Sequence, residues 1–389
     1  MPELPEPRGV SLRTDPDGGH ERQGQSGSNP ARDVAATGGD VGSGLDLARR
    51  LGREAPLPGR GSTDELWSLL GSIAAVDVTV ARIVEPHLDA LAILGEQAAT
   101  GELGEQAATG ELGRPGAPRD TDRTWGVFAA EGPGMRLEAQ AATGDDATPG
   151  RTGGSGETDT APPRWTLNGT KPWCSLAGRL DAALVTAWLP DGERRLFAVD
   201  LRHAGVHVLE NSWHATGLAA VESGPVRFDD VPATAVGEAG WYLQRDGFAW
   251  GGIGVAACWW GGAVGIARAL TAAAARREPD QIGLLAIGAV DAALTTARLA
   301  LADAARQIDA GLADGAAGAL LAQRTRLIVA EACESVITRV ARALGPAPLA
   351  LDAEHARRVA DLSLYLRQHH SDRDDAVLGR TLLEKGTSW

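Results

Sequence analysis

The residues best suited to chemistry stand in positions 165–189, which read WTLNGTKPWCSLAGRLDAALVTAWL. Trp173 and Ser175 lie two positions apart, shortly after Asn168-Gly169, a pair that favours a tight turn between two strands. An indole can cover one face of a flat ring compound, and a nearby hydroxyl can hydrogen-bond to its polar edge. The alternative for Trp173 is a core tryptophan beside a β turn. We take this turn as the candidate site for a flat, partly polar ligand.

A second candidate lies near the C-terminus, where His369 and His370 are adjacent. Imidazole titrates near neutral pH and can remove a proton from a substrate, so both histidines are candidates for a general base. The alternative is that the stretch HHSDRD forms a solvated helix end. Asp372, Asp374 and Asp375 could join the histidines in a metal cluster, but a charged helix terminus is the better interpretation, and we predict no metal site.

The three cysteines, Cys174, Cys258 and Cys333, are widely spaced and form no CxxC pair. This spacing disfavours a disulfide framework and a structural zinc site, and it fits a reducing compartment. Cys174 neighbours the candidate turn, but no adjacent histidine supports a nucleophilic role. The N-terminus has no basic stretch followed by an apolar run, so no secretory signal is apparent, and we expect a cytoplasmic protein.

The charge balance argues against nucleic acid as a partner. The net charge is −14, and no basic stripe is visible along the chain. Phosphate binding needs clustered Lys and Arg, so we expect no nucleic-acid surface. Only two of the 37 basic residues are lysines, Lys171 and Lys385, which together with abundant Ala and Gly indicates a GC-rich genome. A hydrophobic fraction of 43% is typical of a globular protein.

The first third of the chain contains a polar leader followed by helices. Residues 1–62 are rich in Gly, Pro, Ser, Asp and Arg without sustained apolar periodicity, which predicts a disordered leader. Residues 63–120 form the predicted N-terminal helical domain, beginning with one helix from Asp64 to about Ile93. The nonapeptide LGEQAATGE occurs at 94–102 and again, unchanged, at 103–111. Two identical copies indicate a duplication, and we assign them no chemistry.

In the remaining two thirds of the chain, the apolar pattern changes once, from short β-like runs to helical spacing. Residues 121–238 contain short β-like runs separated by turn residues, which predicts a mostly antiparallel β domain with a polar hairpin or loop at 143–163. Residues 239–389 are predicted to form a four-helix bundle from segments at about 241–276, 282–310, 316–344 and 353–384. An uncharged stretch between Asp246 and Arg268, with GxxxG at Gly261 and Gly265, is long enough to span a bilayer. Its glycines and amphipathic neighbours favour a buried bundle helix, so we expect no membrane span.

Three segments together resemble the acyl-CoA dehydrogenase family: FAAEGPG at 128–134, the 165–189 segment and SGPVRFDDVP at 223–232. The family shows LNGxKxWITNG, then an acidic strand FDDVxVP, then a helical bundle, and the resemblance covers about residues 64–385. It implies an α+β multidomain fold with N-terminal helices, a central antiparallel β barrel or sandwich and a C-terminal four-helix bundle. It also implies FAD bound between barrel and bundle, and a homodimer or homotetramer.

The resemblance assigns roles to named residues. Trp173 would pack against the flavin ring, and Ser175 would take the place of the family's Thr at the ring edge. The loop equivalent to the family's TEPGAGS would contact the flavin pyrimidine through the backbone of Ala129, Ala130 and Glu131. The Arg that reaches the FAD diphosphate of a neighbouring subunit would be Arg276 or Arg277, with Arg277 preferred. Two other family motifs near the cofactor are altered here, at positions 251–254 and 342–346, so the diphosphate end has fewer of the usual contacts.

The family's catalytic Glu stands eight residues after an RD pair. Counting from Asp361, this register reaches His369, with His370 beside it. The resemblance implies oxidation of the CH–CH group of an acyl-thioester-like substrate, with electrons passing to an acceptor protein. The His in place of Glu keeps two alternatives open. One is a flavin-dependent monooxygenase on the same fold acting on an aromatic substrate, and the other is a non-catalytic relative that retains the scaffold.

Overall fold

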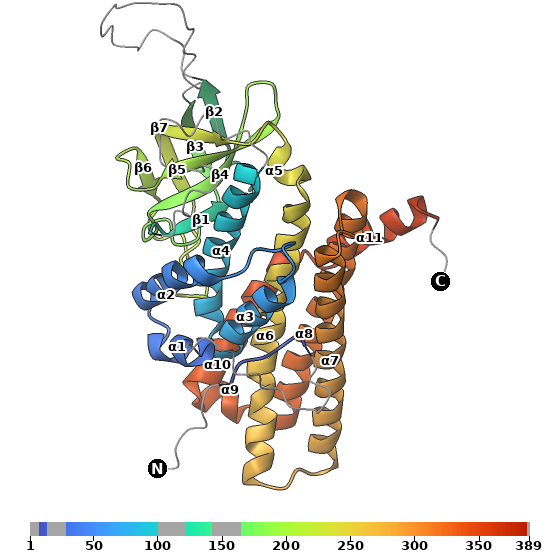
Figure 1. The fold of residues 1–389 in the computed structure, drawn as a ribbon. Coiled ribbons are helices and arrows are strands. Elements are labelled where there is room, and N and C mark those ends of the chain that lie inside the picture. The colour runs from blue at the N-terminus through green and yellow to red at the C-terminus, as the bar shows by residue number, and fades with distance from the viewer. Residues whose placement is uncertain (1–7, 14–28, 100–121, 142–164, 387–389) are drawn as a thin grey trace, which may run out of the picture. The chain divides into compact units, whose positions relative to one another are not determined.

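The computed structural model describes residues 8–13, 29–99, 122–141 and 165–386. The chain divides into two compact units (Figure 1). The helical unit comprises residues 1–88, 214–221 and 245–389, and the β unit comprises residues 89–213 and 222–244. The N-terminal helices and the C-terminal bundle therefore form one unit, whereas the sequence suggested two separate domains at 63–120 and 239–389.

The β unit is built on a seven-stranded sheet within the described residues. Its spatial order is β1-β4-β2-β3-β7-β5; β5 pairs again with β4, which closes the sheet, and β6 pairs with β7. β1 and β2 run parallel to β4, and the other pairings are antiparallel. The predicted mostly antiparallel barrel is thus confirmed. The strands are β1 Trp125–Phe128, β2 Leu137–Ala141, β3 Trp165–Lys171, β4 Ala182–Trp188, β5 Arg194–Asp200, β6 Val206–Val208 and β7 Val226–Val236.

The core of the β unit lies where β4 and β5 meet the C-terminal part of α4 (Val78–Ala99) and the short helix α5 (Trp241–Gln244). Six of the seven residues of β4 are buried, because the strand consists almost wholly of Ala, Val and Leu and is covered on both faces. Removal of apolar side chains of this kind from water lowers the free energy of the folded state. The cluster includes Ala90, Leu91, Ile93, Trp125, Leu184, Leu196, Val236 and Tyr242.

The pair Asn168-Gly169 does not form the predicted turn. Both residues lie inside β3, where the register with β7 shifts between Leu167 and Gly169 in a β-bulge. Gly169 has φ 115, and a Cβ atom there would stand 2.2 Å from the carbonyl oxygen of Arg136, so the site requires glycine. The chain turns only after Lys171, through Trp173 (φ 59).

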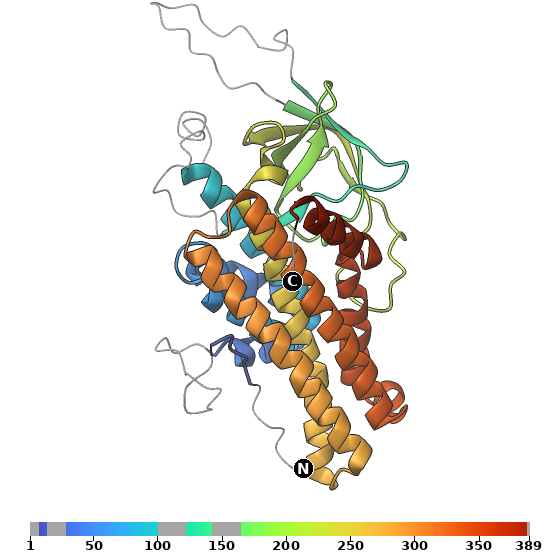
Figure 2. The ribbon, with the colours of Figure 1, turned by 90° about the vertical axis from the view of Figure 1, so that its right-hand side faces the viewer.

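The helical unit contains long helices that run side by side. In the view of Figure 2, α6 (Asp246–Arg276), α7 (Gln281–Asp309) and α8 (Gly315–Leu344) lie along one another, and α3 (Thr63–Val76) and α10 (Ala353–Tyr365) pack against α6. The remaining elements are α1 Pro30–Thr37, α2 Val41–Glu54, α9 Ala347–Leu351, the 3-10 helix η2 Leu366–Gln368 and α11 Asp372–Glu384. The predicted helical bundle is confirmed.

Small residues let α6 approach α3 closely. A Cβ atom on Gly261 would lie 2.1 Å from the carbonyl oxygen of Gly71, and one on Gly265 would lie 2.7 Å from that of Ala75. The GxxxG spacing thus serves contact between these helices. Among the described residues, α6 and α7 are long and apolar enough to cross a bilayer. In α6, 78% of the apolar 18-residue stretch is buried inside the protein. That burial identifies α6 as a core helix, as the sequence favoured.

Three sequence expectations need correction. The leader 1–62, expected to be disordered, contains α1 and α2, because Asn29 and Asp40 cap them and apolar side chains such as Val34, Leu45 and Leu51 are buried at helical spacing. The last bundle segment, 353–384, breaks between α10 and α11. The duplicated nonapeptide extends beyond α4 into residues outside the described ranges, and so does the 143–163 segment.

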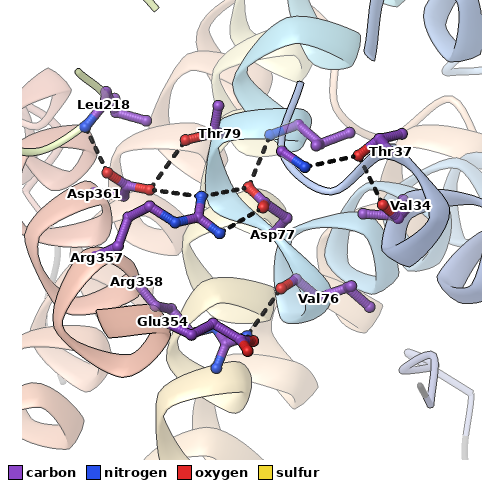
Figure 3. A network of polar contacts seen from close by, with 12 residues as sticks. Val34, Thr37, Val76, Asp77, Thr79, Leu218, Glu354, Arg357, Arg358 and Asp361 are labelled. Atoms are coloured by element: carbon purple, nitrogen blue, oxygen red, sulfur yellow. Dashed lines mark hydrogen bonds and ion pairs between the residues drawn. The ribbon is translucent and has the colours of Figure 1, made fainter. Parts of the chain in front are cut away.

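The third correction concerns the helix expected from Asp64 to about Ile93, which ends at Val76 and begins again at Val78. Asp77 has extended backbone angles, and its carboxylate accepts from the backbone N–H of Val80 at 3.1 Å and from the guanidinium of Arg357 at 2.8 Å (Figure 3). The break is therefore stabilised by a cap on the second helix and by an ion pair to α10.

Candidate functional site

Trp173 lies in the turn that follows β3 and presents its indole outward. The side chain is 57% exposed, so it is not the core tryptophan that the alternative interpretation required. Its φ of 59 is uncommon for a bulky residue, which favours a functional reason for its presence. Two backbone hydrogen bonds anchor the turn to the segment before β7: Cys174 N–H donates to Gly224 O at 3.0 Å, and Leu176 N–H donates to Glu222 O at 2.7 Å. The turn therefore holds an exposed aromatic ring in a defined position.

Ser175 is buried beside this turn. Its Oγ lies 2.8 Å from Oγ of Ser223, so one hydroxyl donates to the other. Because a hydroxyl can both donate and accept, this hydrogen bond joins the turn to the segment before β7. Ser223 was part of the quoted SGPVRFDDVP segment, but its partnership with Ser175 could not be read from sequence.

The loop after β1 holds Ala129, Ala130 and Glu131. The hydroxyl of Thr186 donates to Ala129 O at 3.3 Å, and the Glu131 carboxylate accepts from Lys171 Nζ at 2.6 Å and from Trp188 Nε1 at 3.3 Å. Arg194 approaches the same carboxylate at 3.6 Å. The side chain of Glu131, for which the sequence suggested a backbone role only, therefore fastens this loop to the barrel.

Lys171 connects the loop to the Trp173 turn, and sequence reasoning gave it no role. Its side chain is 1% exposed, and its ammonium donates to Glu131 and, at 2.9 Å, to Thr186 Oγ1. Burial lowers the pKa of Lys171, and the hydrogen bond and charge of Glu131 oppose that shift. A signal was present in the sequence: Lys171 is one of only two lysines in a chain that otherwise uses arginine.

His369 belongs to the helical unit and follows η2 directly. It is 6% exposed, and its Nε2 lies 3.8 Å from Asp375 Oδ1 and 4.0 Å from Asp374 Oδ2. Burial and the positive charge of Arg326 lower the pKa of His369. Asp374 and Asp375 raise it and His370 lowers it, all with smaller effects. The imidazole is thus neutral at neutral pH, the form that accepts a proton.

Arg326 on α8 holds the backbone next to His369. Its guanidinium donates to Gln368 O at 3.0 Å and to Gly252 O at 2.7 Å, and it stacks over the Trp259 ring at 4.8 Å. One side chain therefore ties α8 to α6 and to the end of η2. The Trp259 ring also meets the His369 imidazole edge-on, with 6.4 Å between ring centroids. Arg326 therefore holds the backbone before His369, and Trp259 packs against its ring.

His370 differs from its neighbour. It is exposed, its Nδ1 lies 3.3 Å from Asp374 Oδ1, and its backbone N–H donates to Asp374 Oδ2 at 3.0 Å. These contacts place it at the start of α11, as the helix-end interpretation describes. Within the described residues no cluster of His, Cys, Asp and Glu is arranged to hold a metal ion.

Two further residues were singled out by sequence, Arg277 at the end of α6 and Cys174 within the Trp173 turn. Arg277 is exposed just past the end of α6, where its backbone N–H caps the helix by donating to Ala273 O at 3.1 Å. Cys174 is buried, and burial raises the pKa of its thiol. A thiol that stays protonated is a poor nucleophile, in agreement with the sequence interpretation.

Residues 140–231 match the family model for the middle domain of acyl-CoA dehydrogenases. No curated protein sequence matches the chain. Solved structures with the same fold include a nitrososynthase from Micromonospora carbonacea var. africana, with 18% identity, a TM-score of 0.69 and coverage of 92% of this chain and 93% of that one.

Two others represent different chemistry on this fold. The dibenzothiophene monooxygenase TdsC from Paenibacillus sp. A11-2, solved with FMN and indole, has 16% identity and a TM-score of 0.70, over 92% of this chain and 95% of that one. A glutaryl-CoA dehydrogenase from Mycobacterium smegmatis has 17% identity and a TM-score of 0.69, over 94% and 92% of the two chains. These similarities establish the fold over 92–94% of this chain.

Proposed function

Because the chain has the acyl-CoA dehydrogenase fold and carries that family's middle domain, we propose that it is a flavin-dependent oxidoreductase. The observation that carries the proposal is the exposed indole of Trp173, held at a positive φ beside the loop that contains Ala129 and Glu131. Bound flavin would supply two-electron redox chemistry, which amino-acid side chains lack.

The residues present fit a flavin. Trp173 offers an aromatic face, and Ser175 is the proposed contact for a polar ring edge. The backbone of Ala129, Ala130 and Glu131 would meet the pyrimidine side of the ring. Arg277 is the candidate for the diphosphate of FAD from a neighbouring subunit. FAD is the form that the resemblance implies, and the mass of the cofactor released from purified protein decides between FAD and FMN.

For the reaction, we propose oxidation of the CH–CH group of an acyl-thioester-like substrate, with an electron-acceptor protein as partner. His369 is the proposed base, because it is held neutral and can take a proton from the carbon next to the thioester carbonyl. His370 remains a secondary candidate. Carbonyl conjugation acidifies that proton, and the imidazole stores it while the hydride equivalent leaves the substrate.

A second function, flavin-dependent oxygenation of an aromatic substrate, is favoured by one observation. At the position where the family carries a carboxylate base, this chain has His369. A neutral imidazole can accept and donate a proton near neutral pH and carries no negative charge. TdsC, a monooxygenase solved with FMN and indole, has the same fold. A scaffold without catalysis is the third possibility that the experiment below addresses.

Two features extend the proposal to assembly and location. Exposed apolar side chains on α7, Ile282, Leu284, Leu285 and Leu299, between 54% and 64% exposed, support a homodimer or homotetramer formed through the bundle. Free, buried thiols at all three cysteines are consistent with a cytoplasmic location.

The visible spectrum of the purified protein, alone and after addition of FAD or FMN, tests flavin binding. Anaerobic bleaching by an acyl-CoA supports dehydrogenation. Consumption of oxygen with reduced flavin and an aromatic substrate supports oxygenation. A protein that stays colourless and does not quench flavin fluorescence contradicts both and leaves the scaffold.

Trp173→Gly sharpens this test, because glycine accepts the positive φ without strain and keeps the turn folded. Loss of ring stacking should weaken flavin binding about fivefold, since an aromatic pair contributes about 1 kcal/mol and about 1.4 kcal/mol corresponds to a factor of ten. Trp213→Ala, which removes a half-buried tryptophan of the same unit, is the control. Equal affinity in wild type and Trp173→Gly would contradict the assignment of Trp173.

A further inference from the structure

The ammonium of Lys171 is the starting point, because a buried charge needs a reason. The side chain is 1% exposed at the end of β3, and removing an ammonium from water costs several kcal/mol unless a partner compensates. Its partners are the Glu131 carboxylate at 2.6 Å and the Thr186 hydroxyl at 2.9 Å. A charge-assisted hydrogen bond at that distance is among the stronger polar contacts in proteins.

The partners of Lys171 fix the loop after β1. Thr186, besides accepting from Lys171, donates to Ala129 O at 3.3 Å. Glu131 uses its second oxygen to accept from Trp188 Nε1 at 3.3 Å. Both Thr186 and Trp188 belong to β4, so the loop is tied at each end to the same strand through contacts that meet at Lys171.

Lys171 also fixes the turn that carries Trp173. Its carbonyl oxygen accepts from the Cys174 thiol at 3.3 Å, and Pro172 packs on the loop so closely that a Cβ on Gly132 would lie 3.1 Å from Pro172 Cγ. Trp173 follows two positions after Lys171 in a strained backbone conformation. Any shift of Lys171 therefore moves the turn and the loop together.

We propose that Lys171, with Glu131 as its charge partner, is the positioning residue that holds the Ala129–Glu131 loop and the Trp173 turn in register as two walls of one binding site. The proposal rests on the flavin function proposed above and assigns Glu131 a role through its side chain. Neither residue needs to react. Their contribution is a fixed spacing between backbone groups on one wall and an aromatic face on the other.

The variants are Lys171→Met, Glu131→Gln and the double variant Lys171→Met/Glu131→Gln. The double variant removes both charges, so no uncompensated ion stays buried and thermal stability should return close to that of the wild type. The matched control is Arg227→Met/Asp229→Asn, which removes an exposed ion pair of 3.0 Å from β7 in the same unit.

Hydrogen exchange of flavin-free protein, followed by mass spectrometry, measures directly whether Lys171 and Glu131 hold the loop and the turn in place. In Lys171→Met and in the double variant, peptides covering residues 126–134 and 172–177 should exchange at least about tenfold faster together, while the control leaves both unchanged. Unchanged exchange in either segment would overturn the proposal. This readout does not depend on flavin, so a wild-type protein that binds no flavin removes the proposed function alone.

Flavin affinity and the spectrum of the bound flavin measure whether the loop and the Trp173 turn are correctly placed around the flavin. In the double variant we expect about tenfold weaker flavin binding and an altered visible fine structure, although the melting temperature matches the wild type. A merely structural pair would lower the melting temperature of the single variants and leave affinity and spectrum unchanged in the folded double variant. That second result would also overturn the proposal.

Discussion

At the scale of single residues, the environment of His369 determines its proton chemistry. Its imidazole is buried, the Arg326 guanidinium approaches it from α8, and Asp374 and Asp375 approach it from α11, with His370 beside it. Burial and the positive charge disfavour the imidazolium ion, whereas the carboxylates favour it. The balance lowers the pKa of His369, so a step that needs the neutral ring persists below pH 6.5, the usual value for histidine.

The two kinds of neighbour should move the pH profile in opposite directions. Asp375→Asn removes a negative charge that stabilises imidazolium, so the pKa of His369 falls further and the acid limb of kcat/KM moves to lower pH. Arg326→Gln removes a positive charge, so the pKa rises and the acid limb moves to higher pH. NMR titration of the His369 ring, assigned with His369→Gln, measures the same shifts without turnover. Shifts of the same sign in both variants would contradict this account.

Residue types identified this site only in part. Trp173 and the two histidines were evident because indoles and imidazoles are chemically distinctive. Lys171 and Glu131 were not recognised as a pair, because they stand 40 positions apart and their contact depends on how β3 and β1 are placed by the sheet. His369 and His370 are neighbours in sequence, yet one is buried and the other exposed, and the break between η2 and α11 in which both lie has no proline or glycine to announce it.

At the scale of elements, one carboxylate joins three segments of the helical unit. Asp361 on α10 accepts from the backbone N–H of Leu218 at 2.6 Å and from the Thr79 hydroxyl at 3.0 Å, and Arg357 links it to Asp77 (Figure 3). Asp361 is 1% exposed. It thereby holds the 214–221 segment and the start of α4 against α10.

Asp361→Asn tests this junction. The amide has one acceptor oxygen in place of two, so either Leu218 N–H or Thr79 loses its partner while buried, at a cost of about 1–3 kcal/mol. The free energy of unfolding, measured with urea, should fall by that amount. Glu354→Gln, at an exposed i,i+4 pair with Arg358 on the same helix, should change it by less than about 0.5 kcal/mol. Equal effects of the two substitutions would contradict the assigned role of Asp361.

The elements themselves were largely predictable, because apolar spacing reports which face of a helix or strand is buried. The bundle helices and most strands appear where the periodicity placed them. The break at Asp77 was not predictable, since the Arg357 that stabilises it lies 280 positions away. The leader helices α1 and α2 were missed because a composition rich in Gly and Asp suggested disorder, although Asp40 serves as a helix cap.

At the scale of the whole molecule, the surface of α7 bears on assembly. Only 22% of its apolar 18-residue stretch is buried within the protein. Ile282, Leu284 and Leu285 are each about 60% exposed. Apolar side chains gathered on one helix usually mark a contact with another protein surface. A net charge of −14 opposes association at long range, so moderate salt should strengthen it.

Leu285→Glu should dissociate the proposed oligomer. Burying an unpaired carboxylate in an apolar interface costs several kcal/mol, so self-association should weaken more than about 100-fold. Sedimentation velocity at micromolar protein would show a smaller species, while Val208→Glu, on the exposed strand β6 of the other unit, keeps the wild-type distribution. A wild-type protein that sediments as a monomer would contradict the proposal.

The hydrogen bond between Leu218 and Asp361 also has a consequence for biosynthesis, because it spans 143 positions. A ribosome adds about 5–20 residues per second, so Leu218 is made roughly 7–30 s before its partner exists. During that interval the nascent 214–221 segment has no carboxylate to receive its amide, and its backbone must stay hydrated. The strands on either side, β6 and β7, both precede α10 in the chain, so they can pair while the last helices are still being synthesised.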